Sequence, residues 1–348
     1  MTRRSPASAA EPADRCHQFA IGDIGVAVRT PVPHALDDFS SLYDTCRRER
    51  GVSGKLIHME VRRHSKGPIG RRQYDIVGDG EVLSTARTSA EILPHLEWGI
   101  NRRVIATRSE FVQLHAATLV RGGRGVIIAG PSGAGKSTLT AGLIARGWQY
   151  LSDEFALIHA RTGMLHPFPR AVSVKSGSFA IVERLGLPLF RKRPYVRDLK
   201  GPLGYIRPAD VGRNVVAEPA PPRLVVLPRY TGHDTVRTRE IPRARAAFRL
   251  AGQMLNREMY DARVVPILAR VMAEARCYAL ECGPLDAACD RVESLLGQVD
   301  AGAPSACPCV NRKSGSKRCG GRCGRAGGCR HQTQNPNNAS GGSADDAA

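Results

Sequence analysis

The sequence predicts an α/β fold built around a strand, a glycine-rich loop and a helix. Residues 125–130, GVIIAG, are a short apolar run typical of a buried strand, and residues 138–147, TLTAGLIARG, have helical spacing and end on glycine. Between them lies GPSGAGKST, residues 130–138, with the Gly-x-x-x-x-Gly-Lys-Ser spacing of a phosphate-binding loop. Strand, loop and helix in this order predict a nucleotide-binding core.

The segments before this loop predict a small α/β section over residues 17–108. Alternating apolar and polar residues predict a half-exposed strand over 17–30, and helical spacing predicts a helix over 32–46. Strands are expected over 55–63 and 72–85, the latter with a Gly-Asp-Gly hairpin turn, followed by a helix over 89–106 despite Pro94. Residues 111–130 then predict two strands joined by the turn RGGRG, leading into the loop.

The remaining elements complete a second domain over residues 109–300. A strand interrupted or ended by acids is expected over 148–159, and a strand, a turn and a helix over 170–188. Residues 189–222 are rich in Pro, Gly and Arg and predict a long mobile segment. A strand over 222–230, two helices, a strand over 275–283 and a helix over 285–299 follow.

Length and charge limit the classes of protein. With 348 residues and 42% hydrophobic content the chain can form a large core without disulfides or metal. Residues 1–16 are expected to be a disordered leader, and because no apolar run approaches the length of a membrane span, the protein is expected to be cytoplasmic, without a membrane partner. The net charge of +19 is mostly diffuse and the sequence has no basic stripe with interleaved aromatics, so a nucleic-acid partner is not expected.

The ten cysteines divide between body and tail. Those of the body are expected to be reduced core residues: Cys16, Cys46, Cys277, Cys282 and Cys289. The tail, residues 301–348, holds the other five with His331, in C-x-C and C-x₃-C spacings that a soft metal could use. Paired C-x₂-C knuckles are missing, so a disordered Gly-, Cys- and Arg-rich extension is the preferred interpretation.

The loop residues have the types that phosphate binding requires. Gly130, Gly133 and Gly135 allow a tight turn and bring backbone N–H groups close to phosphate oxygens, to which the helix start adds its partial positive charge. Lys136 can reach the β- and γ-phosphates, and Ser137 offers the hydroxyl that ligates magnesium in such loops. The alternative is a glycine turn with an incidental lysine. The expected nucleotide contacts are Gly130, Pro131, Ser132, Gly133, Ala134, Gly135, Lys136, Ser137 and Thr138.

Three further polar residues are candidates for the site. Asp153 and Glu154 lie 17 and 18 residues after Lys136, a distance that fits a helix and a short return strand, so both are candidate magnesium ligands. Two solvated acids at an exposed strand end are the alternative. His115, in the apolar stretch VQLHAATLV, is a candidate catalytic residue, against the alternative of a satisfied core or hairpin histidine.

The stretch LHAATLVRGGRGVIIAGPSGAGKST, followed by GWQYLSDE, resembles the catalytic domain of HPr kinase/phosphorylase. In that family a histidine lies 15 residues before the first loop glycine, as His115 does here, and a strand ending in two acids follows the loop helix. The front section and the segments PRAVSVKSGS and VRDLKGPLGYIRPA are more similar to the HprK-related kinase A proteins. The resemblance covers residues 111–155 closely and most of 17–300 loosely.

The resemblance implies an α/β P-loop kinase fold related to the ATP-dependent phosphoenolpyruvate carboxykinases, with a mixed central sheet and flanking helices. It also implies transfer of the γ-phosphoryl group of ATP to a serine hydroxyl, with Mg²⁺. Asp153 would be the base or a metal contact, Glu154 would stand at a second aspartate, and His115 would lie beside the phosphates. Lys175 and Lys200 are weaker candidates for contacts with the transferring group. The relatives form oligomers, which leaves a homo-oligomer open for this chain.

Two departures from the family separate this chain from the phosphocarrier enzymes. Those enzymes have glutamate directly after the loop serine, where this chain has Thr138, and the glycine-rich segment associated with the reverse reaction has no clear counterpart. We therefore expect kinase chemistry on a protein or small-molecule hydroxyl and leave dephosphorylation open. The alternative is an ATP-binding sensor that transfers no phosphate.

Overall fold

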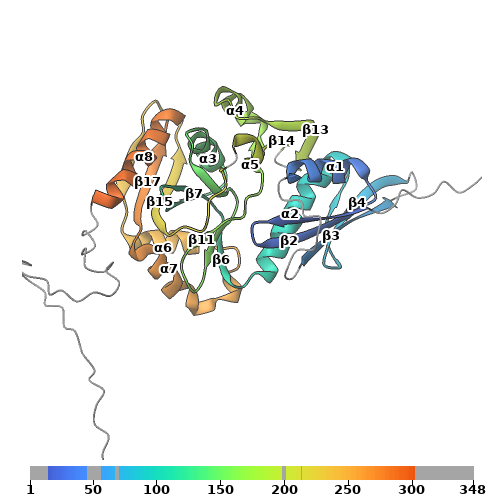
Figure 1. Ribbon diagram of the computed structural model, residues 1–348, viewed down its shortest axis with the longest axis horizontal. Helices are drawn as coiled ribbons and strands as arrows, with labels where there is room; N and C mark the ends of the chain where they lie inside the picture. Colours follow the sequence, from blue (N-terminus) through green and yellow to red (C-terminus); the bar gives the residue numbers. More distant parts are fainter. Residues whose placement is uncertain (1–14, 45–55, 67–69, 198–200, 213, 302–348) are drawn as a thin grey trace, which may run out of the picture. The chain divides into compact units, whose positions relative to one another are not determined.

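The computed structural model describes residues 15–44, 56–66, 70–197, 201–212 and 214–301, which belong to one compact unit. They form a mixed α/β structure with several sheets (Figure 1). No helix of this part of the chain has both the length and the apolar character to cross a membrane.

The central sheet has six strands in the order β16-β17-β15-β8-β7-β9. The strands are β16 (Arg237–Glu240), β17 (Arg276–Cys282), β15 (Pro222–Tyr230), β8 (Arg124–Ala129), β7 (Ala116–Arg121) and β9 (Gln149–Ser152). β17, β15 and β8 run parallel to one another, whereas β16, β7 and β9 pair antiparallel with their neighbours. The sheet is therefore mixed, as the family resemblance implied.

Alternation along β8 supplies both faces of this sheet with core residues. Val126 and Ile128 pack with α3 (Lys136–Ala145) and α8 (Leu285–Ala301), while Ile127 and Ala129 pack with α6 (Arg243–Ala251) and α7 (Val264–Ala273) (Figure 1). Successive strand residues point to opposite faces, so a continuous apolar run is what a strand covered on both sides requires.

The N-terminal section is a second sheet, in the order β1-β2-β3-β4-β5. Its elements are β1 (Arg15–Ile21), β2 (Ile24–Thr30), α1 (Pro33–Leu42), β3 (Leu56–Lys66), β4 (Arg71–Gly78), β5 (Glu81–Ala86) and α2 (Ser89–Thr107). Its core joins Phe19, Ile57 and Leu96 with residues from much later in the chain, such as Phe168 and Tyr205. The N-terminal section thus shares one core with segments that follow the loop.

Two three-stranded sheets complete the structure, in the orders β11-β10-β6 and β12-β14-β13. The first contains β6 (Phe111–Leu114), β10 (Ala156–His159) and β11 (Leu165–His166), and the second β12 (Val172–Lys175), β13 (Phe190–Arg197) and β14 (Gly201–Ile206). The short helices are η2 (Ser176–Ser178), α4 (Phe179–Arg184), α5 (Pro208–Val211), η4 (Arg257–Met259) and η5 (Asp261–Arg263). β13 packs against α2, which connects the β12-β14-β13 sheet to the N-terminal section.

Two strand predictions are wrong about where the chain turns. Residues 17–30 form the hairpin β1–β2 rather than one strand, because Gly22 has a φ of +59° and turns the chain with Asp23. Residues 111–130 form three strands rather than two. The chain bends at His115, so that β6 pairs with β10 while β7 pairs with β8.

The predicted mobile segment 189–222 instead contains β13, β14 and α5. Phe190, Tyr195 and Tyr205 are buried there, and the apolar surface that they bury offsets the flexibility implied by the Pro, Gly and Arg content. β16 was not predicted. Residues 148–159 do form a strand interrupted at the acids, as β9 and β10.

The terminal and cysteine predictions have mixed outcomes. β1 includes residues 15 and 16, which the predicted leader contained, and Cys16 is exposed rather than in the core. Cys277, Cys282 and Cys289 are free and buried as predicted. Residues 1–14, Cys46 and the tail from 302 lie outside the described residues.

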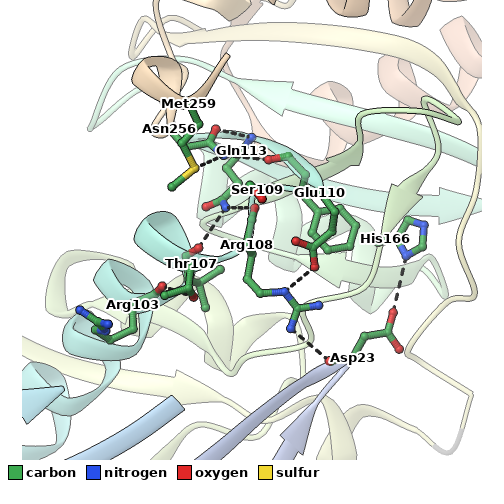
Figure 2. A network of polar contacts seen from close by, with 12 residues as sticks. Asp23, Arg103, Thr107, Arg108, Ser109, Glu110, Gln113, His166, Asn256 and Met259 are labelled. Atoms are coloured by element: carbon green, nitrogen blue, oxygen red, sulfur yellow. Dashed lines mark hydrogen bonds and ion pairs between the residues drawn. The ribbon is translucent and has the colours of Figure 1, made fainter. Parts of the chain in front are cut away.

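A buried amide pair joins β6 to the segment after α6 (Figure 2). The Asn256 side chain donates a hydrogen bond to the Phe111 carbonyl (2.8 Å) and accepts one from the Gln113 backbone N–H (3.0 Å). Gln113 donates to the carbonyls of Val104 (3.1 Å) and Arg108 (3.0 Å) at the end of α2. These bonds connect α2, β6 and the 256 segment in a region from which water is excluded.

We predict that Asn256→Leu lowers the free energy of unfolding by about 2–4 kcal/mol, because it leaves one buried N–H and one buried carbonyl without a partner. Urea unfolding of the full-length chain measures this, with Glu258→Ala, on the exposed side of η4, as the control. A change equal to that of the control would contradict the role of Asn256.

Candidate functional site

Strand directions bring the predicted residues to one edge of the central sheet. β8 ends at Ala129, directly before the loop, and β7 runs in the opposite direction with Ala116 paired to Ala129. β9 is antiparallel to β7 and ends at Ser152, so it points the same way as β8. His115, Gly130 and Asp153 therefore emerge at the same edge, although 38 positions separate the first from the last in the sequence.

The glycine loop, residues 130–138, turns from β8 into α3. Gly133 and Gly135 have φ values of +86° and +94°, a region that side chains disfavour. No side chain caps the start of α3, and the first N–H groups of a helix have no partner within it. Lys136 is only 8% exposed, and its ammonium donates to the carbonyls of Gly130 (2.7 Å) and Pro131 (3.1 Å). The loop thus holds a cation beside a helix N-terminus, the two features that attract phosphate.

Asp153 lies directly against this loop. The Ser137 hydroxyl donates to its Oδ2 at 3.1 Å, while Oδ1 is buried with no hydrogen-bond partner among the described residues. Burial first, and then the charge of Glu154, raise the pKa of Asp153 to about 7, against the lowering effects of Ser137 and Lys136. A carboxyl group with this pKa can accept or release a proton near neutral pH.

Glu154 has a different environment from its neighbour. The Asn101 amide in α2 donates to its Oε2 at 2.7 Å, and the Arg170 guanidinium lies 3.3 Å from the same oxygen. The side chain lines the same cavity as Asp153. Helix α2 therefore fixes the orientation of an acid at the candidate site.

Arg170 is the centre of this buried polar cluster. Its guanidinium pairs with Glu97 (3.0 Å) and donates to the Asn101 side-chain oxygen (2.5 Å), and Glu97 also accepts from the Tyr43 hydroxyl (2.7 Å). Burial alone would lower the pKa of Arg170, but Glu97, Tyr43 and Glu154 raise it well above its ordinary value. Arg170 is therefore charged and neutralises carboxylates on both sides.

These residues line a cavity of about 540 Å³. Residues of the glycine loop line it, together with His115, Asp153 and Glu154. The second three-stranded sheet and η2 add Lys175 and Ser178, whose hydroxyl lies 3.4 Å from that of Thr138. Lys200 lies outside the described residues. The volume is in the usual range for small-molecule sites.

Sequence reasoning missed Arg170, Asn101, Glu97 and Tyr230. Arg170 has no local motif. Its partners at the end of α1 and in α2 lie 69 to 127 residues away, and Glu154 lies 16 residues before it. Asn101 and Glu97 lie four residues apart on α2. Both side chains are buried, which is unusual for polar residues of a helix. Tyr230 ends β15 and lines the cavity. A polar pair on the buried face of a helix was the one available signal.

Comparisons with known proteins give limited similarity. Residues 85–179, which contain α2, the glycine loop and Asp153, match the family described as SynChlorMet cassette protein ScmC. No curated protein matches the chain. Among solved structures, the HPr(Ser) kinase/phosphatase from Coxiella burnetii matches with 16% identity over 54% of this chain and 94% of that chain, at a TM-score of 0.27. This is a weak structural similarity to a kinase/phosphatase.

We predict that Asp153→Asn stabilises the protein at high pH. The unfolded carboxyl ionises near pH 4 and the folded one near pH 7, so wild-type stability falls as pH rises through this window. The penalty is absent below the window and complete above it. The variant should therefore exceed the wild type by up to about 4 kcal/mol at pH 8 and by much less at pH 4 to 5. Urea unfolding in EDTA at both pH values measures this, and a gain independent of pH would contradict the assignment.

We predict that Arg170→Met lowers the free energy of unfolding by about 3–5 kcal/mol, because it leaves buried carboxylates without their cation. Adding Glu97→Gln to this variant removes one of these charges, so the double variant should be more stable than Arg170→Met alone. Denaturant unfolding of both variants and of Glu97→Gln tests this. Additive losses would show that Arg170 and Glu97 do not act as a pair.

Proposed function

We propose that this chain is an ATP-dependent phosphotransferase that transfers the γ-phosphoryl group to a hydroxyl of a protein or small-molecule acceptor. The contact between Ser137 and Asp153 carries this proposal. A loop hydroxyl, a buried carboxylate and a buried lysine ammonium face one cavity, and one carboxylate oxygen has no partner among the residues that the structure describes. These are the components that phosphoryl transfer requires for positioning and charge neutralisation.

The residues present fit a magnesium ion. Mg²⁺ prefers oxygen ligands and is usually held by one or two carboxylates together with substrate phosphates. Ser137 Oγ and Asp153 Oδ1 are such ligands, and Glu154, which lines the same cavity, is a third candidate. When bound, the ion would supply positive charge to the β- and γ-phosphate oxygens.

The residues of the chain divide the remaining tasks. Backbone N–H groups of the glycine loop and Lys136 hold the triphosphate. Asp153 takes the proton of the acceptor hydroxyl while the acceptor oxygen bonds to the γ-phosphorus and the bond to the bridging oxygen breaks, releasing ADP. His115 and Lys175, which line the cavity, are placed to contact the transferring group.

The fold and the sequence resemblance support this proposal from outside the site. The fold is mixed α/β, with the glycine loop between β8 and α3. The sequence resemblance to HPr kinase/phosphorylase favours a serine hydroxyl as acceptor. The ScmC family description names no activity.

The test is incubation of the full-length protein with γ-labelled ATP, Mg²⁺ and a lysate of the source cells separated into protein and small-molecule fractions. We predict label in one fraction, which identifies the acceptor class. Lys136→Ala should reduce transfer about 10²- to 10³-fold because it removes a cation from the transferring phosphates. Lys192→Ala, an exposed lysine that contacts Ser41, is the matched control.

Asp153→Asn should bind ATP but transfer its γ-phosphoryl group about 10²- to 10⁴-fold more slowly, because the amide cannot accept the proton of the acceptor hydroxyl. An unchanged rate would remove Asp153 from the mechanism. No label in either fraction, with ATP bound, would reject the transferase and favour a nucleotide sensor.

A further inference from the structure

The cavity lining combines ionisable and apolar side chains. The ionisable ones include Asp153, Glu154 and Lys175. One group of apolar residues comes from the end of β15, the turn after β17 and the start of α8: Tyr230, Pro284, Leu285 and Ala288. We call this group the apolar shelf.

The strand order places Asp153 and Tyr230 on opposite sides of the glycine loop. β8, which leads into the loop, lies between β15 and β7, and β9 lies beyond β7. Tyr230 ends β15 on one side of the loop, and Asp153 follows β9 on the other. A nucleotide whose terminal phosphate faces Asp153 therefore extends its other end toward the apolar shelf.

Tyr230 has the exposure expected of a binding residue. Its side chain is 63% exposed, and its Cβ lies 3.8 Å from the place that a Cβ on Gly135 would occupy. Of the large apolar side chains exposed in the described part of the chain, Tyr230 is the one that lines this cavity. An exposed aromatic ring beside a phosphate-type loop can bury apolar surface against a stacked base. The loss of side-chain entropy is small, because the ring rotates about only two torsions.

We propose that the apolar shelf is a nucleobase subsite in which the base stacks on Tyr230 against Pro284 and Leu285. The proposal rests on the nucleotide binding of the proposed function and does not depend on phosphoryl transfer. Stacking on an aromatic face accepts any base, because every base has a π-face. The subsite therefore adds affinity for nucleoside triphosphates over inorganic polyphosphate and discriminates little between ATP and GTP.

The experiment compares Mg-ATP with Mg-tripolyphosphate, which has the phosphates but lacks a nucleoside. Titration calorimetry on the full-length protein gives both affinities for wild type, Tyr230→Ala and Tyr230→Phe. Tyr230→Ala should weaken Mg-ATP about five- to a hundredfold, the worth of one base stacked on an aromatic ring, and leave tripolyphosphate within about twofold. Tyr230→Phe keeps the ring and should bind both ligands like wild type. Because Tyr230 is exposed, truncation leaves the core intact.

A fluorescent variant gives a second readout. The fluorescence of the tryptophan in Tyr230→Trp should be quenched by ATP and by GTP but not by tripolyphosphate. Phe248→Trp, at a residue of α6 that is 82% exposed and does not line the cavity, is the matched control and should respond to none of the three.

The subsite is rejected if Tyr230→Ala weakens both ligands equally or neither, or if the wild type binds ATP no more tightly than tripolyphosphate. Absence of binding by either ligand rejects both this subsite and the proposed function. If the Tyr230 effects hold while no label is transferred, the subsite stands and the transferase is rejected. If label is transferred but Tyr230→Ala binds Mg-ATP normally, the transferase stands and the subsite falls.

Discussion

The pairing of the buried Arg170 guanidinium with Glu97 and Glu154 is the interaction on which the rest of the structure depends. Glu97 is part of α2 in the N-terminal section, and Glu154 follows β9 at the edge of the central sheet. A buried charge is tolerated only when paired and hydrogen-bonded, so these elements must meet in one arrangement for any of them to be buried. The same ion pairs therefore stabilise the junction and orient an acid in the cavity.

The reversed direction of β7 is the second constraint. β7 lies antiparallel between β8 and β9. His115, which precedes β7, therefore lies at the same edge of the sheet as Gly130, which follows β8, and Asp153, which follows β9. The bend at His115 places β6 in another sheet, and His115 lines the cavity. The site is thus built from a strand start and two strand ends rather than from one continuous segment.

The sequence allowed prediction of the buried strand before the loop, the loop and its helix, and the acids, because each is encoded within a few adjacent residues. The mixed sheet followed from the family resemblance. Val126 to Ala129 alternate between two covered faces, and the glycines need no distant partner to turn. The hairpin at Gly22 was readable in principle, since the buried positions change phase between Ile21 and Ile24. The ordered structure of residues 189–222 could not be predicted from the sequence, because its tyrosines are buried against residues distant in sequence. Arg170 was hidden for the same reason.

The two hydrogen bonds from Lys136 to carbonyls of its own loop have a consequence for anion selectivity. The ammonium donates to two loop carbonyls at 2.7 and 3.1 Å, so any anion that binds the ammonium competes with these two contacts. A singly charged ion such as chloride gains little from this exchange, whereas an anion with several charges can also reach the helix N-terminus. The two bonds therefore hold the loop in shape and make its cation a weak site for simple salts.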